Sequence, residues 1–425
     1  MKQLPATIYR AAAIRDAYGH AARPGAIAVR NGRVLAAGQP DDLPRRVVEG
    51  ARVVERPGEL LIPALVNAHV HLDLTGIEPV AFNGNIQDWL QHVMDNRPSE
   101  VGPITRAVHR GMRLSAEAGV GYVGDIAGSV PAVEARINAP GELTVPGVSY
   151  LECLGIGRDQ AERFDEVVDA LDRLPFETPV PGHDRGVVLG IQPHAPYSTG
   201  KQVYELATKL SHRRIYRLAT HLAEWQAELE FIRTGTGPFV DLLKSLGKWD
   251  ETIKPAGDHP IDWLEPELRR GRWLLAHCNY VDNRHIEILH RTGTGVAYCP
   301  EASDYFGHRG HRYRDMLEEG VDVCLGTDSM LCEGPAESVD PQPMSILRQM
   351  RYLYQRDGTD PDTLLQMATT NGMLALEFSE ADATFRKGAP ARFNAIPIND
   401  NDSTDALAQA LTNRQPVQPL NATSD

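Results

Sequence analysis

The sequence is poor in the features that mark exported or membrane-embedded proteins. Its five cysteines are an odd number scattered through 425 residues, and they form neither a disulfide framework nor a CxxC metal motif. No uninterrupted apolar stretch approaches the ~18 residues needed to span a bilayer. The first thirty residues lack the compact apolar block of a secretory signal. We therefore expect reduced thiols, a cytoplasmic location and no membrane partner.

The sequence also lacks an excess of basic residues. Its 43 lysines and arginines are outnumbered by 57 acidic residues, which gives a formal net charge of −14. A protein that binds nucleic acid or an anionic membrane needs clustered lysine and arginine, so the charge argues against both partners. A small-molecule substrate fits better. The 42% of hydrophobic residues are enough for a sizeable globular core.

From Leu60 onwards, apolar strand-like segments alternate with segments of helical periodicity, such as 104–118 and 163–174. Parallel strands need crossover connections and become buried on both faces, so eight such strands predict a (β/α)₈ barrel. A doubly wound open sheet is the competing architecture. The predicted strands are 60–69, 120–126, 146–154, 186–193, 216–222, 272–278, 294–299 and 321–327.

The two ends of the chain lack the alternation of strands and helices and contain short strand-like segments instead. Asn31-Gly32 lies between two short apolar runs, and Asn-Gly is typical of a two-residue hairpin turn. Residues 384–398 return to strand-like character. We expect residues 1–59 and 380–413 to form one discontinuous β-sandwich domain around a barrel domain of residues 60–379. Residues 414–425 are predicted to be a polar tail.

Histidines recur where the predicted barrel strands end. His69 and His71 close the first strand, and in an extended chain residues i and i+2 point the same way. His194, His221 and His277 follow three further strands. A single histidine there is explained by chance, but five at four strand ends are not. Glu224 and Asp328 add carboxylates, so the pattern predicts a hydrolytic metal site.

The motifs at these strand ends resemble the amidohydrolase superfamily, in particular its aminohydrolase and chlorohydrolase branch. That branch includes cytosine, guanine, S-adenosylhomocysteine and aminofutalosine deaminases. The resemblance covers nearly the whole chain and implies a (β/α)₈ TIM barrel with a small β-sandwich domain from both termini. It rests on the segments NAHVH (67–71), PHAPYS (193–198), THLAE (220–224), AHC (276–278) and LGTDS (325–329).

The resemblance implies that His69, His71, His221 and Asp328 hold one divalent metal. Three imidazoles and a carboxylate suit zinc, although iron or manganese can occupy the same set. Metal-bound hydroxide would displace ammonia from an amine-bearing carbon of a purine-like or other heteroaromatic molecule. Glu224 would move the proton, and Asp328 would accept one as hydroxide forms.

Two details of the family pattern remain to be assigned in this chain. His277 resembles a histidine that orients the nucleophile, and it could instead ligate the metal. Two-metal members use a bridging carboxylated lysine at the end of strand 4, and residues 186–197 contain no lysine. We therefore expect one metal.

Substrate recognition is expected in the loops at the strand ends. The candidate substrate residues are His194, Trp89, Ser303 and Asp304. A tryptophan could equally pack its loop onto the barrel, and His194 could make a structural hydrogen bond. A chlorohydrolase or amidase on the same scaffold is the nearest alternative, and a non-catalytic scaffold protein is the alternative of another class. A homodimer stays open.

Overall fold

The computed structural model describes residues 5–174, 186–213, 216–333 and 342–421. They form two compact units. One takes in the described residues of 1–67, 113–122 and 335–425, and the other those of 68–112 and 123–334. The helices of residues 346–375 therefore group with the chain termini. The sequence assigned these residues to the barrel domain, and that domain assignment stays a prediction.

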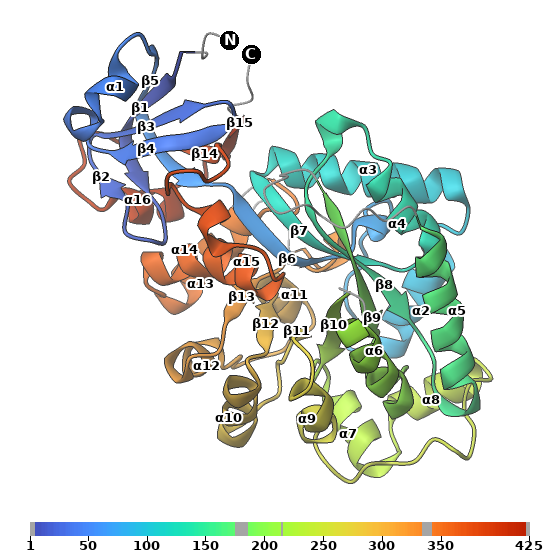
Figure 1. Ribbon diagram of the computed structural model, residues 1–425. Coiled ribbons are helices and arrows are strands. Elements are labelled where there is room, and N and C mark those ends of the chain that lie inside the picture. Colours follow the sequence, from blue (N-terminus) through green and yellow to red (C-terminus); the bar gives the residue numbers. More distant parts are fainter. Residues whose placement is uncertain (1–4, 175–185, 214–215, 334–341, 422–425) are drawn as a thin grey trace. The chain divides into compact units, whose positions relative to one another are not determined.

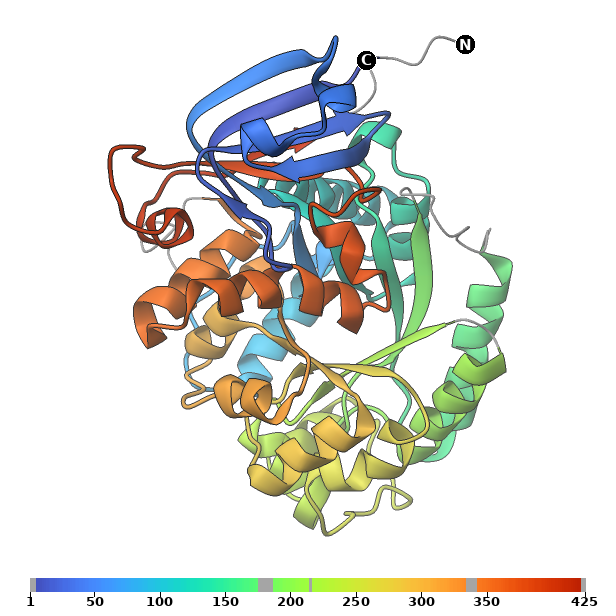
Figure 2. The same cartoon turned by 60° about the vertical axis from the view of Figure 1, so that its left-hand side comes forward.

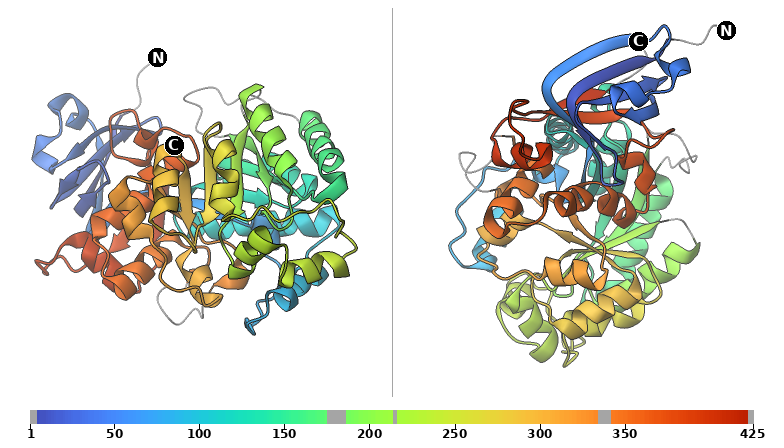
Figure 3. Two further views of the ribbon diagram at one scale, coloured as in Figure 1. Left: turned by 90° about the horizontal axis from the view of Figure 1, so that it is seen from below. Right: turned by 90° about the vertical axis from the view of Figure 1, so that its left-hand side faces the viewer.

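Strands from both ends of the chain form a mixed sheet (Figure 1). They are β1 (Thr7–Arg15), β2 (Ala21–Ala22), β3 (Gly25–Arg30), β4 (Arg33–Gly38), β5 (Arg52–Pro63), β14 (Arg392–Pro397) and β15 (Gln418–Asn421). Their order is β15-β14-β5-β1-β3-β4, with β2 paired to β1. The predicted hairpin at Asn31-Gly32 is confirmed, since both residues have positive φ and β3 pairs with β4 across them. Figure 3 shows how strongly the long strands of this sheet curve.

The second sheet has eight strands in sequential order. They are β6 (Leu65–Val70), β7 (Val120–Ala127), β8 (Gly147–Cys153), β9 (Val187–Pro193), β10 (Arg217–Leu222), β11 (Trp273–His277), β12 (Gly295–Tyr298) and β13 (Val323–Leu325). The chain after β13 returns to β6, where the N–H groups of Thr327 and Asp328 donate to the carbonyl oxygen of His69 at 3.1 and 3.0 Å. These contacts bring the first and last strands together, so the predicted (β/α)₈ barrel is confirmed.

Helices follow most barrel strands and pack on the outside of the sheet, as α5 (Gln160–Arg173) does on β8 and α6 (Lys201–Arg213) on β9 (Figure 2). The remaining helices of the barrel region are α2 (Ile86–Asn96), α3 (Val101–Glu117), α4 (Val130–Ile137), α7 (Gln226–Thr234), α8 (Pro238–Ser245), α9 (Pro260–Leu268), α10 (Asn283–Thr292), α11 (Pro300–Tyr305) and α12 (Tyr313–Glu319). The other helices are α1 (Arg45–Val48), α13 (Ile346–Asp357), α14 (Pro361–Ala368), α15 (Thr370–Ala375) and α16 (Ala406–Thr412).

One local prediction was wrong. The apolar run predicted as one strand, 60–69, is divided between two sheets: Leu60–Pro63 ends β5, and β6 begins only at Leu65. Both pieces are fully buried, so hydrophobicity alone does not mark the boundary. Residues 414–421 contain β15, whose backbone pairs with β14, and residues 422–425 lie outside the described residues. The assignment of 414–425 as a polar tail stays a prediction.

The predictions about thiols and membrane segments can also be compared with the structure. All five cysteines are buried and free. Among the described residues, none of the helices combines the length and apolar character that crossing a bilayer requires.

Candidate active site

The carboxyl ends of four barrel strands place five candidate residues together. His69 lies in β6 and His71 directly after it. His221 is the second-last residue of β10, and His277 is the last residue of β11. Asp328 follows β13 by three residues. All five side chains are buried. Parallel strands of a barrel end at the same face, which explains how residues 259 positions apart, His69 and Asp328, converge.

The donor atoms of these side chains lie within reach of one cation. Nε2 of His71 is 3.4 Å from Oδ1 of Asp328, and Nε2 of His69 is 3.8 Å from the same oxygen. Ligand atoms of His69, His71 and Asp328 all lie within 4.8 Å of one another, and so do those of His69, His221 and His277. The two groups share His69, so a single buried site collects imidazoles and a carboxylate.

The hydrogen bonding of the imidazoles also fits a metal. Among the described residues, the buried Nε2 of His69 has no hydrogen-bond partner, which is costly unless something else binds it. Nδ1 of His221 lies 3.0 Å from the carbonyl oxygen of His194 and can donate its proton there. This bond leaves Nε2 of His221 available as a ligand, as in many metal sites.

Burial keeps these histidines neutral. Desolvation, reinforced by the neighbouring histidines, holds the pKa values of His69, His71 and His277 well below the ordinary value. Burial lowers the pKa of His221 to about 3. Only a neutral imidazole can bind a metal, so the site is set for a cation rather than for protons.

Glu224 lies in the turn after β10, beside this group. Its Oε1 is 3.7 Å from Nε2 of His277. Burial, together with the carboxylate of Asp328, raises the pKa of Glu224 well above its usual range, and burial raises the pKa of Asp328 to about 7. Carboxyl groups with such raised pKa values can both accept and donate a proton near neutral pH.

The backbone at these strand ends adopts conformations that non-glycine residues rarely use. Ala223, His277 and Asp328 have φ values of 50°, 76° and 60°. Such left-handed residues cost free energy and persist where the surroundings hold them. Here the turns after β10 and β11 bind each other, because Cys278 N–H donates to the carbonyl oxygen of Leu222 at 3.0 Å. The constrained turns therefore help to fix the positions of His277 and Asp328.

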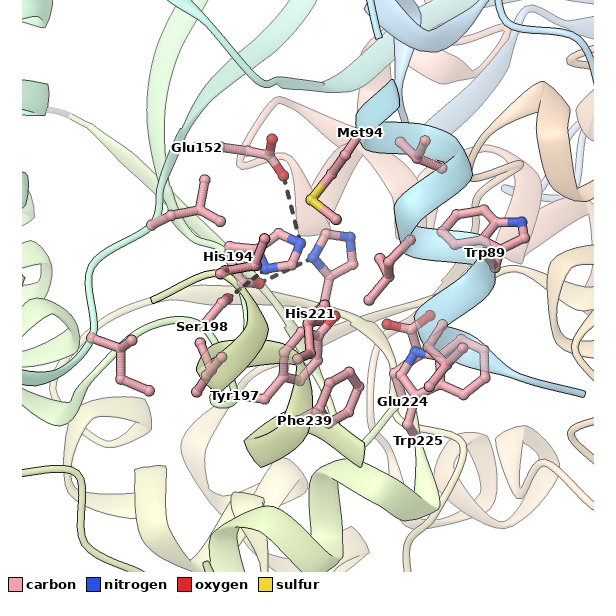
Figure 4. Close-up of a pocket in the computed structure, with 18 of the residues that line it drawn as sticks. Trp89, Met94, Glu152, His194, Tyr197, Ser198, His221, Glu224, Trp225 and Phe239 are labelled. Carbon is pink, nitrogen blue, oxygen red and sulfur yellow. Dashed lines mark hydrogen bonds and ion pairs between the residues drawn. The ribbon is translucent and has the colours of Figure 1, made fainter. Parts of the chain in front are cut away.

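A cavity of about 420 Å³ opens from the histidine group (Figure 4). Its apolar walls come mainly from α2, α8 and the turns after β8 and β10, and α2 packs against α8. The aromatic side chains in the lining are Trp89, Tyr197, Trp225, Phe239 and Phe306. A pocket of this size and character suits a drug-sized molecule with a flat ring.

Two of the four candidate substrate residues line the cavity and two do not. Trp89 and His194 line the cavity. Within the described residues, the lining includes neither Ser303 nor Asp304. The Ser303 hydroxyl donates to Oδ1 of Asn279 at 3.0 Å, and Asp304 forms an ion pair with Arg309. A role in substrate binding stays a prediction for all four residues.

Sequence reasoning missed an ion-pair cluster at the edge of the cavity. Arg97, which ends α2, donates to Oδ2 of Asp73 at 2.8 Å and to Oε2 of Glu152 at 3.2 Å. Glu152 is in turn 3.8 Å from His194. Asp73 stands two residues after His71, which could have drawn attention to it, but no motif marks Arg97 or Glu152. The cluster ties the α2 wall to the ends of β6 and β8.

Gly128 provides the space for Arg97, and this gives a testable prediction. A Cβ atom at Gly128 would lie 1.3 Å from Nη2 of Arg97, so Gly128→Ala must displace the guanidinium from its carboxylates. Because the Arg97 side chain is 30% exposed, we expect a loss of about 1–3 kcal/mol in unfolding free energy, less than for a fully buried pair. Urea unfolding of both proteins measures this change in unfolding free energy. Gly141→Ala is the control, since a Cβ there meets nothing within 4 Å. Equal stability of the two variants would contradict the role of Arg97.

Known proteins resemble this chain in sequence and in fold. An aminodeoxyfutalosine deaminase of Deinococcus radiodurans is 30% identical over 369 residues, covering 83% of this chain and 82% of that protein. Helicobacter pylori aminofutalosine deaminase, solved in complex with methylthio-coformycin, superimposes with a TM-score of 0.80 at 19% identity and 97% coverage of both chains. A Xanthomonas campestris adenosine deaminase with bound zinc gives a TM-score of 0.71 at 19% identity, covering 97% of this chain and 90% of that one.

A family model supports the same relationship. The model of the amidohydrolase family matches residues 60–418, which include all eight strands of the barrel and all the candidate metal-binding residues. The chain therefore belongs to the amidohydrolase family.

Proposed function

We propose that this protein is a mononuclear metal-dependent aminohydrolase that releases ammonia from an amine-bearing carbon of a purine-like nucleoside. The observation that carries the proposal is the position of Glu224, a buried carboxyl group of raised pKa, beside a buried group of imidazoles and Asp328. The 30% identical relative from Deinococcus radiodurans, a deaminase of aminodeoxyfutalosine, supports the choice of reaction and substrate class.

The metal would be held by His69, His71, His221 and Asp328. Nε2 of His69, which has no hydrogen-bond partner in the described part of the chain, and the neutral imidazoles support this set. Zinc is the favoured ion because such donors suit it. The zinc in the Xanthomonas campestris structure agrees with that choice. When bound, the metal supplies Lewis acidity and lowers the pKa of a coordinated water towards ~7.

The other side chains would manage the protons. Glu224 would take a proton from the attacking water, pass it to the ring nitrogen and then assist the departure of ammonia. His277, 3.7 Å from Glu224, would orient the oxygen that adds to the ring. Asp328 would accept the second proton.

The cavity suits the proposed substrate class. Its aromatic side chains can flank a planar ring, and Glu152 and His194, beside His221, supply polar groups on one side of it (Figure 4). A nucleoside has this same division into a flat base and a hydroxylated sugar. Hydrogen-bonding groups in an otherwise apolar pocket fix the orientation of a ligand.

The proposed reaction can be tested by incubating the zinc-loaded protein with adenine nucleosides, free pterins and triazines and measuring released ammonia. We expect ammonia from the adenine nucleosides above all. Release of chloride from a chlorotriazine, or of a new carboxylate from an amide, without ammonia from any amine would contradict the proposal and favour the hydrolase alternatives. A protein that binds less than about a tenth of an equivalent of zinc would favour the scaffold alternative.

A further inference from the structure

A second buried carboxylate holds the turn that carries Glu224. Glu228, in the first turn of α7, is fully buried, with a relative exposure of 0%. Its Oε1 accepts a hydrogen bond from Ala223 N–H at 2.8 Å, and its Oε2 accepts one from Glu224 N–H at 2.9 Å. Two successive N–H groups therefore converge on one side chain.

The carbonyl side of the same turn is bound by the turn after β11. Asn279 donates from Nδ2 to the carbonyl oxygen of Glu224 at 3.2 Å, and Tyr280 N–H donates to that of Ala223 at 3.1 Å. The Ser303 hydroxyl, 3.0 Å from Oδ1 of Asn279, fixes the orientation of that amide. The main chain of Glu224 is thus held from both sides, and Glu228 supplies the acceptors for its N–H side.

This arrangement exceeds what helix capping requires. Trp225, the residue before α7, makes no capping hydrogen bond with its side chain. A glutamate at the third helical position, as Glu228 is, commonly binds the N–H of the residue before the helix. Glu228 reaches two residues further back, to Ala223, whose φ of 50° is unfavourable for a non-glycine residue. The bond to Ala223 therefore helps to stabilise a turn that an alanine would not adopt alone.

We propose that Glu228 is a positioning residue that sets the location of the Glu224 carboxyl group through the backbone of Ala223 and Glu224, an inference that rests on the proposed function of Glu224. A carboxylate is needed because both of its oxygens accept hydrogen bonds. A glutamine has the same shape but only one acceptor, so one of the two buried N–H groups would lose its partner.

The first test compares Glu228→Gln with the wild-type enzyme. Because a displacement of about 1 Å at a catalytic group can cost on the order of a hundredfold, we expect kcat to fall about 10–100-fold. KM should stay within about threefold and the bound zinc should not change, since Glu228 does not line the cavity described here. Glu267→Gln is the matched control, because Glu267 is also a buried helical carboxylate but pairs with Lys201. We expect that control to keep its kcat.

A double-mutant cycle separates positioning from general destabilisation. If Glu228 acts through Glu224, the Glu228→Gln change should cost less than about twofold in kcat when Glu224 is already glutamine. The same 10–100-fold loss in both backgrounds would overturn the proposal, because the effect would then not pass through Glu224.

A crystal structure of zinc-loaded Glu228→Gln provides a readout without any substrate. We expect the Glu224 carboxyl group to move or to lose its order, while His69, His71 and His221 keep their places. An unmoved and ordered Glu224 would overturn the inference. Failure of the wild-type protein to release ammonia from any amine would instead reject the proposed function, and the position of Glu224 in this variant would still decide the structural claim.

Discussion

Glu224→Gln is expected to lower kcat by about 10²–10⁴-fold while the protein keeps its zinc, because the amide cannot carry the proton that a general acid and base must move. The amide has nearly the shape of the carboxyl group, so the cavity should keep its form. Glu224 is buried beside His277 and outside the proposed ligand set. The loss should therefore appear in kcat rather than in metal content.

The measurement is steady-state ammonia release together with the zinc content of the same preparation. Glu230→Gln is the control, because Glu230 is an exposed residue of α7 six positions further on. Full turnover by a zinc-containing Glu224→Gln enzyme would reject the assigned proton transfer. Loss of zinc from this variant would show instead that Glu224 helps to hold the metal, contrary to the set assigned above.

The barrel and its polar strand ends could be predicted because they depend on local rules. A strand buried on both faces is a nearly continuous apolar run, and the polar side chains at its end lie at the carboxyl face of the barrel. His221 and Asp328 follow this rule, since each stands at or just beyond the end of a buried strand. Neither position required knowledge of the packing.

The supporting residues could not be predicted in the same way, because their roles depend on distant contacts. Arg97 ends a helix that looks exposed in sequence, and only the folded chain brings it between Asp73 and Glu152. Ser303 was a candidate for substrate binding from its loop, yet its hydroxyl turns towards Asn279. The direction of a loop side chain is set by its tertiary neighbours, which sequence periodicity does not record.

Glu228 illustrates the same limit at closer range. It is four residues from Glu224, a spacing that in a helix suggests only a neighbouring side chain on the same face. The two residues are not in one helix, because the turn at Ala223 and Glu224 precedes α7. The Glu228 carboxylate therefore meets backbone N–H groups instead of a side chain, and the left-handed φ of Ala223 makes this geometry possible.

His69→Ala is expected to reduce bound zinc from about one equivalent per chain to less than about a tenth, with ammonia release falling in parallel. His69 is the most informative ligand to remove, because it belongs to both groups of donor atoms that converge in the structure. Its buried Nε2 has no other partner among the described residues, so its contribution to the fold without metal should be small. The variant should thus remain folded but lose the metal.

Zinc content by elemental analysis and thermal unfolding with and without added zinc test this expectation. A metal at about a thousand times its Kd stabilises the native state by about 4 kcal/mol, so chelation should lower the Tm of the wild-type protein but not that of His69→Ala. His212→Ala, at the exposed end of α6, should behave as wild type. Retention of one zinc by His69→Ala would mean that the other donors suffice, with His277 as the natural replacement. Two equivalents in the wild type would contradict a mononuclear site, for which the lysine-free end of β9 is the sequence argument.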